Sequence, residues 1–330
     1  MGEKQSKKRI EWVDTAKGIC ILFVVLNHIM LKISCENPLN DFLTSFRMPL
    51  YFFLSGVFFK AYSNFRIFII KKINKQLIPF VFFYIVYSII CVILFSYPIK
   101  TALTDFIFNQ CQIIYGPLWF LICLFEINIL FYIIHTLVKK KLVQHCVTFL
   151  IGFGGLSLAY FSIKLPLSID SALTCLPFFV FGYYINNETP IMRHSFLDKK
   201  PYIYILCFAL FNLLISRHVE FYKNFFYGSS YLTAHICGFV GTIMVILTAK
   251  KIKFPSIITY YGRYSIIILC THMILIEPIE VFFTIFISNH LLIILCSFLT
   301  ICLFELIIIP FFITYLPYIC AQKELINISK

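Results

Sequence analysis

Long apolar segments make up most of the chain, and short stretches that hold most of the charged residues separate them. A helix needs about 20 apolar residues to cross the hydrocarbon core of a bilayer. The pattern therefore predicts an all-α polytopic membrane protein with about ten transmembrane helices. The predicted helices are residues 11–33, 40–60, 77–97, 114–137, 143–162, 170–186, 201–216, 229–249, 264–285 and 290–318.

The first predicted helix carries polar residues on one face. His28 follows Lys17 by eleven residues, which is three helical turns plus about 20°. The two side chains therefore share a face, about 16 Å apart along the axis, and Asp14 lies one turn below Lys17. Ionisable groups are costly in lipid, so this stripe indicates a functional site. The alternative is a buried structural pair with a hydrogen-bonded histidine.

The second predicted helix contains Arg47 about seven residues from its start, followed by Pro49. The proline is expected to loosen the helix. A buried arginine needs an anion, a carboxylate or a group of carbonyls as its partner. Arg47 is either a further site residue or a side chain that extends to the outer interface. Ser55 and Gly56 form a small surface that another helix can approach closely.

Three lysines, Lys71, Lys72 and Lys75, precede the third predicted helix; we call them the lysine cluster. Such a cluster suits the phosphate groups of a cofactor, but lipid headgroups or membrane topology would explain it equally well. The surrounding residues 65–76 are predicted to form either an amphipathic surface helix or a simple basic loop.

Three more polar or aromatic positions fall within later predicted helices. Trp119 is either an interfacial anchor or a platform for a sugar ring, and Glu126 lies about two turns deeper and needs a partner. His272 lies about two turns into the ninth predicted helix. It is either a structural hydrogen-bonding residue or part of the same cavity as Lys17.

Composition supports a membrane protein. The chain of 330 residues is 60% hydrophobic with 39 phenylalanines, which a soluble domain of this size cannot bury. Its net charge of +13 does not indicate a nucleic-acid partner, because the basic residues form short clusters between apolar segments. The 13 cysteines are scattered, without a Cys-x-x-Cys pair, so we expect neither a disulfide framework nor a metal site.

The distribution of basic residues predicts the orientation. With the N-terminus in the cytoplasm, 21 of the 28 lysines and arginines fall on the cytoplasmic side and 5 on the outer side. Both termini are therefore predicted to be cytoplasmic, with tails at residues 1–10 and 319–330. We expect one integral domain over residues 1–330 in the cell membrane, and no cleavable signal peptide.

Two motifs resemble those of the acyltransferase-3 family, integral membrane enzymes that O-acylate sugars. Residues 12–28 are similar to its first-helix signature, with Asp-Thr-Ala-Lys-Gly at 14–18 and ten residues between Lys17 and His28. Residues 46–56 are similar to its second-helix motif. Asn27 departs mildly, since glycine is common there. Weaker patterns follow in the family's order at residues 71–79, 118–121, 177–182 and 261–272.

The resemblance implies an O-acyltransferase, in the commonest case an O-acetyltransferase. Such an enzyme moves an acyl group from cytoplasmic acetyl-CoA, or another acyl-CoA, to a hydroxyl of a cell-surface or lipid-linked glycan. His28 would act as general base or acyl relay. Arg47 would stabilise charge on the thioester oxygen, and Asp14 would orient Lys17.

The remaining candidates would bind the two substrates. Donor binding is assigned to Lys17, His272 and the lysine cluster, and acceptor binding to Trp119 and Glu126. Two other functions stay open for a polytopic chain with polar groups in its helices. One is a proton-coupled transporter; the other is a flippase or polymerase of a polysaccharide precursor.

Overall fold

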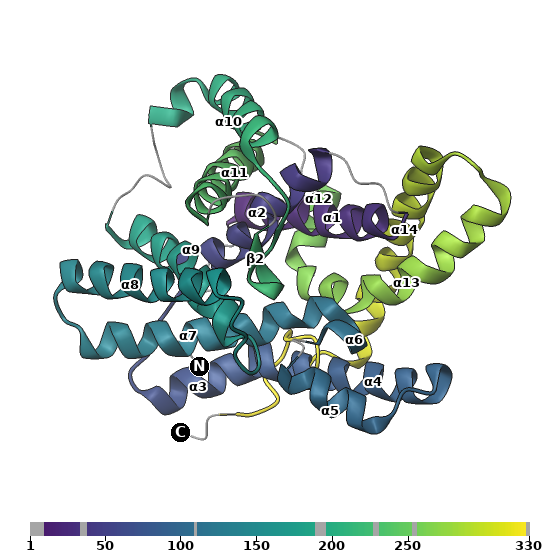
Figure 1. Ribbon diagram of the computed structural model, residues 1–330, viewed down its shortest axis with the longest axis horizontal. Coiled ribbons are helices and arrows are strands. Elements are labelled where there is room, and N and C mark those ends of the chain that lie inside the picture. The colour runs from purple at the N-terminus through teal and green to yellow at the C-terminus, as the bar shows by residue number, and fades with distance from the viewer. Residues whose placement is uncertain are drawn as a thin grey trace, which may run out of the picture.

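The computed structural model describes residues 10–33, 38–108, 111–188, 196–226, 231–252 and 256–327, and these are mostly helical (Figure 1). Each of the ten predicted segments coincides with a long helix, so the all-α fold class is confirmed. The helices are α1 (Glu11–Lys32), α2 (Pro38–Val57), α4 (Ile78–Phe95), α7 (Trp119–Leu137), α8 (Lys141–Tyr160), α9 (Ile169–Glu188), α10 (Pro201–Ile215), α11 (Tyr231–Lys251), α13 (Ser265–Phe286) and α14 (His290–Tyr315).

Seven helical runs in the described ranges are long and apolar enough to cross a membrane. Two shorter apolar helices are residues Ile169–Ile185 of α9 and Pro201–Ile215, which is α10. Helix α2 is not among the seven, because Asp41, Arg47 and several uncharged polar residues lower its hydropathy. The chain is thus a multi-pass membrane protein. The count of ten spans and the cytoplasmic position of both termini stay predictions.

The third predicted helix begins earlier than expected. Helix α3 (Phe65–Lys72) and the π-helical turn η1 (Ile73–Leu77) lead directly into α4, so residues 65–76 belong to one helical run of 31 residues. The other short elements are α5 (Ile99–Phe108), α6 (Gln112–Tyr115), η2 (Gly116–Leu118), η4 (Phe196–Lys199), η5 (Phe221–Lys223), α12 (Ser256–Arg263), and the antiparallel strands β1 (Val219–Glu220) and β2 (Phe225–Phe226).

Helices α1 and α2 lie near the middle of the molecule (Figure 1). Helix α2 packs against α9 and α11, and α1 packs against α12, α11 and α13. A Cβ atom on Gly56 would lie 1.8 Å from the carbonyl oxygen of Phe179, and one on Gly182 would lie 2.0 Å from that of Phe53. Helices α2 and α9 therefore touch backbone to backbone, which confirms the close approach predicted at Gly56.

Glycines also let the backbones of α1 and α12 touch. A Cβ atom on Gly18 would lie 1.9 Å from the carbonyl oxygen of Ile258, and one on Gly262 would lie 1.7 Å from that of Asp14. This contact fixes the half of α1 that carries Asp14 and Lys17. The other half of α1 carries His28.

Candidate active site

A cavity of about 240 Å³ brings together three of the predicted site residues. Helix α1 contributes His28, α2 contributes Arg47, and the start of α7 contributes Trp119. Residues 218–221, around β1, form a further part of the wall. Because these groups come from four separate parts of the sequence, the cavity depends on how the helices pack.

His28 lies beside His272 of α13, with ring centroids 5.3 Å apart and ring planes at 45°. His272 is fully buried, and its Nδ1 atom lies 2.7 Å from the carbonyl oxygen of Ile268. A carbonyl oxygen only accepts hydrogen bonds, so Nδ1 carries the proton and Nε2 keeps a free lone pair. That Nε2 atom is buried without a hydrogen-bond partner among the described residues.

The tyrosine Tyr115 holds the backbone next to His272. Its hydroxyl donates to the carbonyl oxygen of Leu269 at 3.3 Å and accepts from the backbone N–H of Met273 at 3.1 Å. Its ring lies edge-on to His272, with centroids 6.4 Å apart. The position of His272 is therefore fixed from both sides of the residue. The sequence grouped His272 with the donor-binding lysines, but the structure places it beside His28.

Arg47 is buried, at 8% exposure, within α2. Its Nε atom has no hydrogen-bond partner in the part of the chain that the structure describes. The Cys20 thiol donates to the backbone carbonyl of Arg47 at 3.0 Å, which ties this turn of α2 to α1. A buried guanidinium nitrogen without a partner is costly. It is therefore suited to an anionic or carbonyl group that enters the cavity.

Lys17 and Asp14 lie at another level of α1. The helix is continuous from Glu11 to Lys32, so the predicted spacing of about 16 Å between Lys17 and His28 holds. Asp14 is buried and Lys17 is partly buried, and both take part in polar or charged interactions. The Tyr51 hydroxyl donates to the backbone carbonyl of Lys17 at 3.0 Å. Neither Lys17 nor Asp14 lines the cavity around His28.

Members of the lysine cluster differ in their surroundings. Lys71 forms an ion pair with Glu324, with a shortest N–O distance of 2.5 Å. Lys72 lies over the rings of Phe59 and Phe68, 5.7 and 5.5 Å from their centroids, and Lys75 is exposed. The C-terminal segment also docks on Asn74, whose side chain accepts from the backbone N–H groups of residues 325 and 326. A charged ligand at Lys71 would have to compete with Glu324.

The two predicted acceptor-binding residues are not placed together. Trp119 lines the cavity with His28, whereas Glu126 does not. Both carboxylate oxygens of Glu126 are buried, and the backbone of Ser168 lies close enough to interact with them. The group lies close enough to Asp170 of α9 for electrostatic interaction. Only Trp119 is therefore in a position to contact a ligand bound beside His28.

The structure adds polar residues that the sequence analysis did not single out. Glu305 of α14 is buried and accepts from the Thr271 hydroxyl at 2.7 Å, one residue before His272. It is the only charged residue in the apolar segment 290–318. A lone acidic residue in a membrane helix indicates a functional position, so the sequence could have identified Glu305. His218 and Glu220 line the cavity but lie in a short polar connection without any motif. In the described ranges, no group of three or more His, Cys, Asp or Glu side chains could hold a metal ion.

Comparison with known proteins agrees with the motifs. No curated protein and no solved structure matches the chain. A protein family described as an acyltransferase domain matches residues 10–314, which is most of the chain. That span contains α1 with His28, α2 with Arg47 and α13 with His272. The chain therefore belongs to the acyltransferase-3 family of membrane acyltransferases.

Proposed function

We propose that the protein transfers an acyl group, acetyl in the simplest case, from cytoplasmic acyl-CoA to a hydroxyl of a cell-surface or lipid-linked glycan. The observation that carries this proposal is the meeting of His28 and Arg47 in one cavity, with His272 behind His28. Family membership favours an acyltransferase over the transporter and flippase alternatives.

In the proposed reaction His28 is the general base. The sugar hydroxyl attacks the thioester carbonyl carbon and gives its proton to His28. The tetrahedral intermediate then breaks its C–S bond, and the leaving CoA sulfur takes the proton back from His28. One ester bond forms, one thioester bond breaks, and the enzyme returns to its starting state.

Two neighbours support this role for His28. The free lone pair on Nε2 of His272 suits an N–H of His28, which would leave the other nitrogen of His28 to act as the base. An orienting group behind the base is the arrangement found in many nucleophilic active sites. The unpaired Nε of Arg47 suits the oxyanion of the intermediate, where a preorganised donor has its largest effect.

The two substrates would approach from opposite sides of the membrane. His28 shares its cavity with residues 218–221, on the predicted outer side. Lys17 lies about 16 Å away along α1, toward the predicted cytoplasmic side, where the lysine cluster also lies. We assign the CoA phosphates to the lysines and the sugar to Trp119, with the pantetheine arm between them. The cell membrane is the proposed location.

The test replaces His28 with glutamine, which keeps hydrogen bonding but cannot act as a base at neutral pH. Acyl transfer from labelled acetyl-CoA by purified protein should fall by about 10²–10⁴-fold, the usual contribution of a general base. The matched control is His290→Gln, because His290 is exposed at the start of α14. Wild-type transfer by His28→Gln at normal protein levels would refute the catalytic role of His28.

A further inference from the structure

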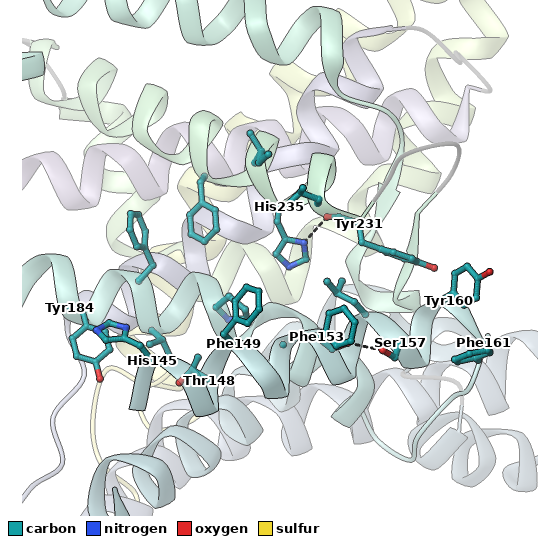
Figure 2. Close-up of a pocket in the computed structure, with 18 residues that line it drawn as sticks. His145, Thr148, Phe149, Phe153, Ser157, Tyr160, Phe161, Tyr184, Tyr231 and His235 are labelled. Atoms are coloured by element: carbon teal, nitrogen blue, oxygen red, sulfur yellow. Dashed lines mark hydrogen bonds between the residues drawn. The ribbon is translucent and has the colours of Figure 1, made fainter. Parts of the chain in front are cut away.

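A long apolar groove lies outside the candidate active site, between α8, α9 and α11 (Figure 2). Its volume is about 910 Å³, near the upper end of the range for ligand pockets, about 300–1,000 Å³. Figure 2 shows it extending from His145 at one end to Tyr160 and Tyr231 at the other, with Phe149 and Phe153 between them. The proposed function makes no use of this groove.

The length of the groove is close to a membrane dimension. Its lining on α8 runs from His145 to Tyr160, which is about 22 Å at the rise of an α-helix. The hydrocarbon core of a bilayer is about 30 Å thick. A groove of this length along a candidate membrane span suits a hydrocarbon chain better than a small polar metabolite.

Several polar side chains of the groove already have partners within the protein, whereas the buried Thr148 hydroxyl has none among the described residues. The Nδ1 and Nε2 atoms of His235 lie 2.9 and 3.0 Å from backbone carbonyl oxygens. The Ser157 hydroxyl donates to the carbonyl one turn earlier, and the Tyr184 hydroxyl donates to the side chain of Gln144. These groups have little bonding capacity left for a sugar. The occupant best suited to the groove is therefore apolar along its length.

One layer of aromatic side chains separates the groove from the candidate active site. Phe221 lines the cavity that holds His28, and its ring centroid lies 6.4 Å from that of His235 and 5.9 Å from that of Phe226. Phe226 in turn lies 4.8 Å from Tyr231. His235 and Tyr231 line the groove. The groove and the cavity therefore lie on opposite sides of the same short hairpin.

Two lysines lie outside the lining, and Lys164 follows the lining residue Phe161 by three positions at the Tyr160 end of the groove. Lys164 follows the end of α8 and pairs with Asp170 at 3.8 Å, and Lys223 pairs with Glu220 at 3.1 Å. Their side chains are 46% and 45% exposed. Burial lowers the pKa of Lys164; among its charged neighbours, Asp170 and Glu220 raise this pKa and Lys223 lowers it. A phosphate between the two ammonium groups would relieve their mutual repulsion, and it would have to compete with Asp170 and Glu220 for them.

We propose that the groove binds the tail of the acceptor, a sugar linked through phosphate to a long hydrocarbon chain. The tail lies along α8, the phosphate lies at Lys164 and Lys223, and the sugar passes the hairpin to reach His28. That this lipid-linked sugar is the acceptor of the acyl group rests on the proposed function. Binding of the lipid phosphate does not depend on catalysis.

The test measures lipid binding to purified protein in detergent by native mass spectrometry, without acyl-CoA. Undecaprenyl phosphate is the probe, and phosphatidylglycerol is the comparison lipid because it also carries a phosphate. Undecaprenyl phosphate should bind to the wild-type protein and should not be displaced by an equal amount of phosphatidylglycerol. If phosphatidylglycerol displaced undecaprenyl phosphate equally well, the groove would hold bulk lipid only. This result with the wild-type protein alone would overturn the proposal.

A matched pair of variants locates the site. Leu156→Trp fills the groove, whereas Leu158→Trp makes the same change on α8 outside the lining. Leu156→Trp should weaken binding of undecaprenyl phosphate by about tenfold or more, since displacing two buried methylene groups has that effect. The control variant should bind as the wild type does. Thermal midpoints of both variants check that they are folded.

Binding of undecaprenyl phosphate that is equal in the two folded variants would overturn the groove assignment.

Replacing Lys164 and Lys223 together with glutamine should weaken binding of undecaprenyl phosphate but not of the uncharged alcohol undecaprenol. Loss of lipid binding refutes only this inference. Wild-type transfer by His28→Gln refutes only the proposed function, so the two failures are distinguishable.

Discussion

Replacing Gly262 with alanine tests the backbone contact that holds α1 in place. A Cβ atom there would lie 1.7 Å from the carbonyl oxygen of Asp14 and 2.5 Å from the backbone nitrogen of Gly18. Ordinary Cβ contacts begin at 3.4 Å, so α1 and α12 must separate by at least about 1.7 Å in that direction. Both neighbours are backbone atoms, which cannot rotate out of the way.

The expected result is a loss of both stability and activity. Overpacking of this kind typically costs about 1–3 kcal/mol of folding free energy. Helix α1 carries Lys17 and His28, and a misplacement of about 1 Å can lower a catalytic rate about 10²-fold. We expect Gly262→Ala to lower the thermal midpoint of the purified protein in detergent and to lower its rate of acyl transfer.

Gly154→Ala is the control, because a Cβ on Gly154 of α8 would meet nothing within 4 Å. Alanine is more favourable than glycine inside a helix by about 0.8–1.0 kcal/mol. This variant should therefore keep or raise the thermal midpoint. If Gly262→Ala matched Gly154→Ala in midpoint and rate, the close crossing of α1 and α12 would be refuted.

Three further predictions concern topology and donor binding. Reporter fusions after Lys141 should read cytoplasmic and fusions after Lys223 external, and the reverse would contradict the predicted orientation. Changing the whole lysine cluster to glutamine should weaken acetyl-CoA binding measured by titration, and unchanged binding at low and physiological salt would leave the cluster a topological signal only. Glu324→Gln removes the competitor for Lys71, so acetyl-CoA should bind a few times more tightly, since a partly exposed ion pair is worth about 1 kcal/mol or less; unchanged affinity would show that Lys71 does not contact the donor.

The sequence by itself determined the helices and the first part of the site. Apolar segments of bilayer length predict helices, because a backbone in lipid must satisfy its own hydrogen bonds. Lys17 and His28 share a face of α1 because that relation depends only on helical periodicity. The family signature on the same residues then identified the class of enzyme, which the family match confirms.

The sequence left residues 65–76 open between an amphipathic helix and a basic loop, and it placed the start of the next membrane helix at residue 77. In the structure α3, η1 and α4 form one helical run that begins at residue 65 and contains these basic residues. Charges predict a boundary in the membrane, but they do not end a helix when nothing in the backbone interrupts it. For this reason the lysine cluster lies on a helix and not in a loop.

Only the tertiary structure decided which distant groups meet. Nothing local in the sequence pairs His28 with His272, brings Glu220 to the cavity or joins Lys71 to Glu324. Such contacts depend on how the helices pack; at the crossings of α1 with α12 and of α2 with α9, glycines let the backbones touch. A hydrophobic pattern records which residues avoid water, but not which helix each buried face meets.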